Sequence, residues 1–224
     1  MRVFENIDCI DGIRRYPARF FDLAIVDPMY DLPDVYLCQG NKVSKTGVTR
    51  KHIDTAKKLA GGAIVCQDYF TELLRVSKHQ IIWGEQYFQF QGKPKGRLIW
   101  DKCNDASSFS NAEIASCDLL DGVRIFRYMW NGMIQADMKH KEKRIHPFQK
   151  PVPLYRWILK RFAEPGFKLL DTHVGSASSL IAFEEFGLDY AGFEIDGDIY
   201  HNAVNRLEQY RLQPALFGSE EMWK

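Results

Sequence analysis

Short runs of consecutive apolar residues recur along the chain, and most of them end at an acidic, aromatic or turn-forming residue. Uninterrupted apolar runs of roughly four to eight residues are typical of strands that are buried on both faces of a sheet. We therefore predict strands at Asp22–Val26, Ala63–Cys66, Gln80–Trp83, Leu98–Trp100, Phe167–Asp171 and Asp189–Glu194.

Between and after these runs, apolar positions follow a helical period. The helices predicted from this spacing are Tyr69–Ser77, Pro153–Ala163, Ser178–Phe186 and Asp198–Tyr210. Strands that alternate with helices form a largely parallel sheet with helices on both faces. The predicted fold class is therefore α/β, with a doubly wound, mostly parallel sheet in a single domain over residues 1–224.

Two polar stretches, residues 31–60 and 101–146, do not fit this alternation, and we expect them to be insertions carried by the sheet. Each contains a basic run. One such run is usually a solvated loop, but two runs in two insertions favour a cleft that binds a polyanion. The candidate polyanion-binding residues are Lys42, Lys45, Arg50 and Lys51 in the first stretch and Lys139, Lys141, Lys143 and Arg144 in the second.

Composition narrows the class of protein. The 224 residues are 46% hydrophobic, which is enough for a core, and the formal net charge of +1 means that any basic surface is local. The five cysteines include no Cys-x-x-Cys pair, which argues against a disulfide framework or a zinc site and for a reducing cytosol. No segment approaches the ~20 apolar residues of a membrane span. We expect a cytoplasmic protein with no membrane partner and no bound metal.

The stretch DLAIVDPMYD at residues 22–31 places Asp27, Pro28, Met29 and Tyr30 directly after a predicted buried strand. The carboxyl ends of parallel strands form the edge at which α/β proteins bind their ligands. A carboxylate, a proline-restrained backbone and an aromatic ring are therefore predicted to lie together at that edge.

A second candidate site follows the strand that ends at Asp171. The small residues Gly175 to Ser178 form a turn into a helix, and Glu194 ends the next strand 23 residues after Asp171. Small residues let a ligand approach the backbone, and a carboxylate on the next strand accepts hydrogen bonds from ribose hydroxyls. The turn lacks the full Gly-x-Gly-x-x-Gly pattern and a following lysine, so a nucleoside without phosphates, such as S-adenosylmethionine, is favoured. A plain tight turn is the alternative.

Together, these segments resemble the amino-directed DNA methyltransferases of the beta arrangement, in which the catalytic motif precedes the cofactor loop. Four segments carry the resemblance. FDLAIVDPMYD is similar to the family's strand that ends in Asp-Pro-Pro-Tyr, and HPFQKP at 146–151 is similar to its His-Pro-Thr-Gln-Lys-Pro segment. DTHVGSAS is similar to its Asp-Pro-Phe-x-Gly-x-Gly-Thr loop, and AGFEID to its ribose-binding strand. IIWGEQYF and LIWDKCN resemble strands of phage and prophage members. The resemblance runs through nearly the whole chain and implies a Rossmann-like class I methyltransferase fold, with the two polar stretches serving target recognition.

The resemblance also implies roles for residues. The Asp27 side chain and the Pro28 carbonyl would accept the two hydrogens of an exocyclic amine, and Tyr30 would stack on a base flipped out of the duplex. Contacts to S-adenosylmethionine are implied for Asp8, His146, Lys150, Asp171, Thr172, His173, Gly175, Ser176, Ser178 and Glu194. Two alternatives stay open: Asp8 only caps a turn, and His146 and Lys150 only fix the turn before a helix.

Two positions depart from the family pattern, since Met29 replaces its second proline and Ala177 replaces its second glycine. Asp27 favours methylation at N6 of adenine, because the N4-cytosine members usually carry serine at that position. The predicted protein is an S-adenosylmethionine-dependent methyltransferase for adenine N6 in double-stranded DNA, from a bacterium or phage, as a monomer or homodimer. The alternatives are N4-cytosine methylation, RNA methylation, and a DNA-binding relative with weak or no turnover.

Overall fold

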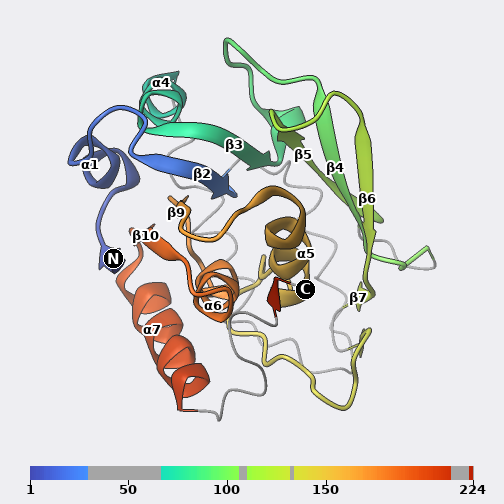
Figure 1. Cartoon of the computed structure of the whole chain (residues 1–224). Helices are drawn as coiled ribbons and strands as arrows, with labels where there is room; N and C mark the ends of the chain where they lie inside the picture. The colour runs from blue at the N-terminus through green and yellow to red at the C-terminus, as the bar shows by residue number, and fades with distance from the viewer. Residues whose placement is uncertain (30–66, 106–109, 132–133, 213–221, 224) are drawn as a thin grey trace.

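The computed structural model describes residues 1–29, 67–105, 110–131, 134–212 and 222–223. Its centre is an eight-stranded sheet with the order β1-β10-β9-β2-β3-β5-β4-β6 (Figure 1). These strands are β1 Arg2–Asn6, β2 Phe21–Val26, β3 Ser77–Trp83, β4 Gly96–Asp101, β5 Ala112–Cys117, β6 Val123–Arg127, β9 Lys168–Asp171 and β10 Asp189–Glu194. A separate antiparallel pair joins β7, Trp130–Asn131, to β8, Ile134–Gln135.

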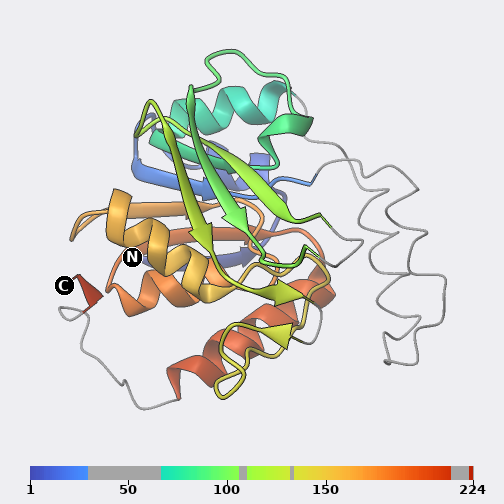
Figure 2. The ribbon, with the colours of Figure 1, turned by 90° about the vertical axis from the view of Figure 1, so that its right-hand side faces the viewer.

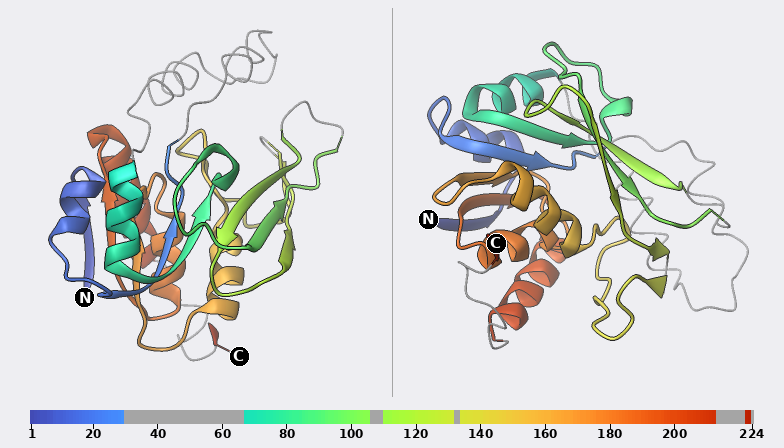
Figure 3. Two further views of the ribbon diagram at one scale, coloured as in Figure 1. Left: turned by 90° about the horizontal axis from the view of Figure 1, so that it is seen from above. Right: turned by 45° about the vertical axis from the view of Figure 1, so that its right-hand side comes forward.

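Helices cover both faces of the sheet (Figures 1 and 3). One face carries α1, Cys9–Arg14, and α4, Gln67–Val76. The other face carries α5, Val152–Phe162, α6, Ser178–Glu185, and α7, Gly197–Arg211, and a short 3-10 helix, η2, spans Glu85–Tyr87. The predicted α/β class and the doubly wound, mostly parallel sheet are confirmed.

Strand β2 explains why its sequence is a continuous apolar run. Leu23 and Ile25 are buried in the core beneath α5 and α6, whereas Ala24 and Val26 are buried in the core beneath α1 and α4. Because successive side chains of a strand point to opposite faces, a strand with a core on each side needs an apolar residue at every position. The same reasoning applies to the other central strands.

The order of the strands reverses direction between β9 and β2, which pair in parallel at the middle of the sheet. The connection from β9 to β10 runs through α6 on one face, whereas α4, between β2 and β3 in the chain, covers the opposite face. Loops that leave a sheet toward opposite faces open a crevice at the carboxyl ends of the two strands. The segments after Val26 and after Asp171 border this crevice.

The expectation that residues 101–146 lie outside the sheet is wrong for β5 and β6. Strand β5 lies antiparallel between β3 and β4, and β6 pairs in parallel with β4 at the edge of the sheet (Figure 2). The polar appearance of these strands has a physical cause: β6 is largely exposed, and only the second half of β5 is fully buried. Strand β1 was not expected either, and it is half exposed beside β10.

The predicted strand Ala63–Cys66 and the first polar stretch, residues 31–60, lie outside the described residues. Of the helices that are described, none is both long enough and apolar enough to cross a membrane.

Candidate active site

Asp27 follows the last residue of β2, at the carboxyl edge of the sheet beside β9. Its Oδ2 atom forms an ion pair with the Lys150 ammonium, which comes from the segment immediately before α5. Lys150 is only 5% exposed and also pairs with Glu113 of β5 across 2.9 Å. The second oxygen of Glu113 lies 2.7 Å from Lys102, at the exit of β4. Four charged side chains therefore form a chain of alternating sign along the edge of the sheet.

This environment shifts the pKa values of the two carboxyl groups, Glu113 and Asp27, in opposite directions. Burial acts to raise the pKa of Glu113, but the ammonium groups of Lys150 and Lys102 outweigh it and lower that pKa to about 2. Burial raises the pKa of Asp27, with Lys150 acting against the shift and the negative charge of Glu113 adding to it. Glu113 is thus the firmly ionised member, and Asp27 is the more basic carboxylate.

Asp171 ends β9 and turns its carboxylate back onto the loop that follows. Its Oδ1 atom accepts the backbone N–H of His173 across 3.0 Å, and Oδ2 accepts the hydroxyl of Ser179 in α6. Burial raises the pKa of Asp171 to about 7 despite these hydrogen bonds, and the negative charges of Asp27 and Glu194 add to the shift. The group therefore changes charge near neutral pH.

Glu194, at the end of β10, fixes the same loop from the neighbouring strand. Its Oε2 accepts the backbone N–H of Gly175 and its Oε1 that of Asp196, each at 3.0 Å. The turn needs left-handed backbone at two positions, Gly175 with φ +56° and Ala177 with φ +62°. Ala177, which stands where the family pattern has glycine, therefore carries a side chain in a conformation that favours glycine.

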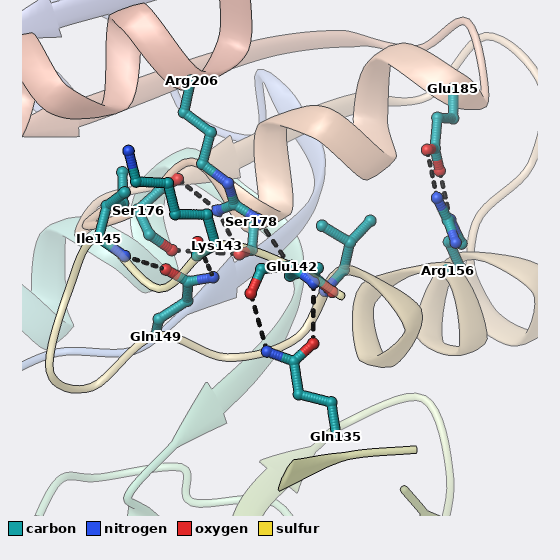
Figure 4. A network of polar contacts seen from close by, with 11 residues as sticks. Gln135, Glu142, Lys143, Ile145, Gln149, Arg156, Ser176, Ser178, Glu185 and Arg206 are labelled. Atoms are coloured by element: carbon teal, nitrogen blue, oxygen red, sulfur yellow. Dashed lines mark hydrogen bonds and ion pairs between the residues drawn. The ribbon is translucent and has the colours of Figure 1, made fainter. Parts of the chain in front are cut away.

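Arg206 of α7 binds the two serines of the loop (Figure 4). Its guanidinium donates to the Ser176 carbonyl at 2.6 Å and to the Ser178 hydroxyl at 2.9 Å, and forms a 2.7 Å ion pair with Glu142. Gln135 in turn binds the backbone of Glu142 through both ends of its amide, with each hydrogen bond at 2.8 Å. The polar atoms of both serines thus support the shape of the loop.

Asp8 caps the first turn of α1, since its Oδ1 accepts the backbone N–H groups of Ile10 and Asp11. The capping role is therefore observed. His173 packs edge-on against the buried ring of Tyr69, with ring centroids 5.4 Å apart, and Tyr69 hydrogen-bonds Thr172 across 2.6 Å. The Thr172 hydroxyl therefore already has hydrogen-bond partners within the protein.

His146 lies beside the cofactor-type loop: a Cβ atom at Gly175 would be 3.7 Å from its Nδ1. Burial lowers the pKa of His146 to about 4, and the positive charges of Lys150 and Arg144 contribute to the shift. His146 is therefore neutral at physiological pH. Its Nδ1 accepts the backbone N–H of Phe148, so it also shapes the turn before α5.

The predicted basic residues of the second stretch, Lys139, Lys141, Lys143 and Arg144, are all exposed. Arg144 also donates to the Pro147 carbonyl at 2.6 Å and lies over the Trp130 ring. Pro28 is buried and Met29 is partly buried next to Asp27. The remaining candidates, Tyr30, Lys42, Lys45, Arg50 and Lys51, lie outside the described residues.

The structure brings three carboxylates to neighbouring strand ends: Asp27 on β2, Asp171 on β9 and Glu194 on β10. A ligand that carries positive charge is favoured at such an edge, and a phosphate is disfavoured. Among the described residues, no three His, Cys, Asp or Glu side chains cluster in a way that could hold a metal ion.

Sequence reasoning missed Glu113 and Lys102, and it assigned no role to Tyr69 or Glu142. Glu113 reaches the site because β5 runs antiparallel to β3, which brings the first residues of β5 to the edge where the parallel strands end. No local pattern announces this, since the residue pairs with Lys150 only through the topology of the sheet.

The fold is that of the class I DNA methyltransferases. TTHA0409 from Thermus thermophilus, solved with S-adenosyl-L-methionine, superposes with a TM-score of 0.56 at 13% identity, covering 96% of this chain and 98% of that one. The cytosine-N4-specific PvuII DNA methyltransferase gives a TM-score of 0.58 at 9% identity, over 98% of this chain and 89% of that one. The M1.HpyAVI–SAM complex gives 0.55 at 14% identity, over 92% and 100%.

Sequence comparison finds a family match over part of the chain. Residues 121–205 match the N6_N4_Mtase model, a DNA methylase family. The Type II methyltransferase M.HindIII of Haemophilus influenzae is 29% identical over 77 residues, which span 34% of this chain and only 25% of that relative. These matches support the resemblance drawn from the sequence: residues 121–205 carry the N6/N4 DNA methylase pattern.

Proposed function

We propose that the protein is an S-adenosylmethionine-dependent methyltransferase that acts on the exocyclic N6 amine of adenine in double-stranded DNA. One observation carries the proposal. Asp27, the first residue of the Asp-Pro-Met-Tyr segment, lies at the carboxyl edge of β2, directly beside the strand β9 that leads into the Asp171–Ser178 loop. The candidate acceptor for the amine and the candidate cofactor loop therefore meet at the switch point of the sheet.

The residues around the loop fit S-adenosylmethionine. When bound, it supplies a methyl group on a positively charged sulfonium. The loop sequence DTHVGSAS contains no lysine or arginine, and the nearby side chains of Asp171 and Glu194 are acidic, which suits a cation and not a phosphate. Both Glu194 oxygens accept backbone N–H groups, and because a carboxylate offers about four lone-pair sites, it can also accept a ribose hydroxyl.

The chain's own groups perform the transfer as follows. The Asp27 carboxylate and the Pro28 carbonyl accept one hydrogen each from the amine, which localises the nitrogen lone pair. Held by the Asp171–Ser178 loop and Glu194, S-adenosylmethionine would supply the methyl group to that lone pair and would keep the carbon–sulfur electron pair on its sulfur. One amine proton then passes to Asp27, so the product amine is neutral. Because the pKa of Asp27 is raised by burial, the carboxylate is a better proton acceptor than an exposed aspartate.

For DNA, the proposal assigns phosphate contacts to the exposed Lys139, Lys141 and Lys143, and to the predicted basic residues of the first stretch. Arg144 is left out of this group, because its side chain is tied to Pro147 and Trp130. Tyr30 remains a proposed stacking surface for the flipped base. Met29 is compatible with this arrangement, because the acceptors come from its neighbours.

N4 of cytosine is the second candidate target. It presents the same two amine hydrogens to Asp27 and Pro28, and one of the similar folds belongs to a cytosine-N4-specific enzyme. The aspartate at position 27 is the feature that favours adenine.

The test is transfer of a labelled methyl group from S-adenosylmethionine to duplex DNA, followed by nucleoside digestion and mass spectrometry. N6-methyladenine supports the proposal, and N4-methylcytosine selects the second candidate. Two outcomes contradict the proposal: methyl transfer to RNA but not to DNA, and no transfer of the label to any nucleoside.

A further inference from the structure

The two oxygens of Glu113 contact different lysines. Oε1 lies 2.7 Å from Lys102 and Oε2 lies 2.9 Å from Lys150. Lys150 also forms an ion pair with Asp27, and Lys102 follows directly after β4. Because the two ends of the Glu113 carboxylate are both occupied, its position between the lysines is fixed.

Each ammonium group lies near a buried tryptophan ring. Lys150 Nζ lies 5.5 Å from the centroid of the buried Trp83 ring, and Lys102 Nζ lies 5.1 Å from that of the buried Trp100 ring. A buried ammonium must be compensated by nearby negative charge. Lys150 is compensated by two carboxylates at once, and Glu113 is the one that has no direct place in the proposed chemistry.

This sharing matters for Asp27. Its Oδ2 atom already contacts Lys150, so a substrate amine has to be accepted while the lysine stays in place. A carboxylate that alone compensates a buried ammonium is a weak base. The more of the lysine's charge Glu113 compensates, the better Asp27 can accept a hydrogen.

We propose that Glu113 is a positioning residue for the reaction: by sharing Lys150 with Asp27, it makes the Asp27 carboxylate basic enough to accept the amine hydrogen while Lys150 stays in place. This inference rests on the proposed methyl transfer to an exocyclic amine. Glu113 touches neither the base nor the cofactor; it acts through the shared Lys150 and through its own negative charge near Asp27.

Other titratable groups also face Asp27 and belong in any interpretation of its titration. Asp171 at the end of β9, Tyr69 of α4 and Tyr155 of α5 all interact with its charge, in addition to the two lysines and Glu113. Because these neighbours are unchanged by a substitution at Glu113, a shift in the Asp27 pKa reports on Glu113 and on the lysine that it shares with Asp27.

The direct experiment is a carbon NMR titration of aspartate carboxyl groups in the free protein, with the Asp27 signal assigned from an Asp27→Asn variant. In Glu113→Gln, Lys150 loses its ion pair with Glu113 and keeps the one with Asp27, so the Asp27 pKa is expected to fall. In Lys150→Met the Asp27 pKa is expected to rise. Glu85→Gln is the matched control. Glu85 is also a buried carboxylate that pairs with two cations, Lys93 and Arg97, but it is not one of the four charged residues that include Lys150.

Kinetics give an independent readout. The acid limb of the kcat profile for DNA methylation is expected at lower pH in Glu113→Gln and at higher pH in Lys150→Met. The plateau of kcat in Glu113→Gln should fall about tenfold or more, with KM for DNA unchanged. A residue with a purely structural role would not move the two acid limbs in opposite directions.

An Asp27 titration that is unmoved or raised in Glu113→Gln overturns the inference. If that variant does not fold, Lys102→Met replaces it. Without Lys102, the Glu113 carboxylate compensates the charge of Lys150 more fully, so the Asp27 pKa should rise. An unchanged Asp27 pKa in Lys102→Met would also overturn the inference. A wild-type protein that transfers no methyl group defeats the proposed function, while the titrations still decide whether Glu113 controls Asp27.

Discussion

The Glu194 carboxylate accepts the backbone N–H of Gly175 across 3.0 Å, which ties the end of β10 to the turn that follows β9. A second hydrogen bond, from the Asp196 backbone to the other oxygen, fixes the orientation of the carboxylate. The group that shapes the loop is therefore the group proposed to accept the ribose hydroxyls. Binding of the cofactor and order in the loop depend on the same side chain.

Replacement of Glu194 by alanine should weaken binding of S-adenosylmethionine. Hydrogen bonds that involve a charged group contribute on the order of 1.5–3 kcal/mol each, so the loss of even one corresponds to roughly a tenfold or greater rise in Kd. Calorimetric titration measures it, and Glu194→Gln, which keeps an acceptor oxygen, should lose less. Equal affinity in the wild type and the alanine variant would remove Glu194 from the site.

Asp171 should make the stability of the protein fall as pH rises toward neutrality. Burial raises its folded-state pKa to about 7, against an ordinary value of 3.8. Between these values the folded state retains a proton that the unfolded state has lost, so the free energy of unfolding decreases with increasing pH by up to about 1.4 kcal/mol per unit.

An Asp171→Asn variant should lack that contribution, so its stability relative to the wild type should increase from pH 4 to pH 7. Urea denaturation at several pH values measures the difference, with Asp121→Asn on the exposed surface as the control. Parallel pH dependences for wild type and Asp171→Asn would contradict the assignment of the buried proton.

Ala177 offers a test of backbone strain. A residue other than glycine at φ +62° costs about 1–2 kcal/mol, and glycine gives back part of this through its larger entropy in the unfolded chain. Ala177→Gly should therefore raise the free energy of unfolding by up to about 1 kcal/mol. Gly175→Ala, at φ +56°, should lower it by a similar amount, although the added Cβ finds space. Changes of the same sign in both variants would refute the strain.

Affinity for duplex DNA should fall steeply with salt, and the exposed lysines of the second stretch should account for part of the slope. Each phosphate contact contributes about −0.9 to the slope of log K against log salt, so Lys139, Lys141 and Lys143 replaced together by glutamine should flatten it by up to about three. Lys160→Gln is the control, since it lies near the end of α5, at the opposite edge of the sheet. A slope that is unchanged in the triple variant would place the DNA elsewhere.

The parts of the fold that the sequence predicted are those whose pattern is local. Strand β10 spans Asp189–Glu194 as expected, and β2 extends its prediction by one residue, because both are buried on two faces. Strand β6 was not predicted, because an exposed edge strand lacks a continuous run of apolar residues. The ion pair between Lys150 and Asp27 joins residues 123 positions apart, so only the assembled sheet reveals it.

The central claim is that Asp27 is the acceptor that activates the target amine. Its most direct test is a single comparison: transfer of labelled methyl to duplex DNA by the wild-type protein and by Asp27→Ala, with S-adenosylmethionine binding measured for each. The account predicts that N6-methyladenine formation collapses in the variant while cofactor binding is largely retained, because the acceptor acts in the transition state. Full methyl transfer by Asp27→Ala would contradict the account, whichever base is modified.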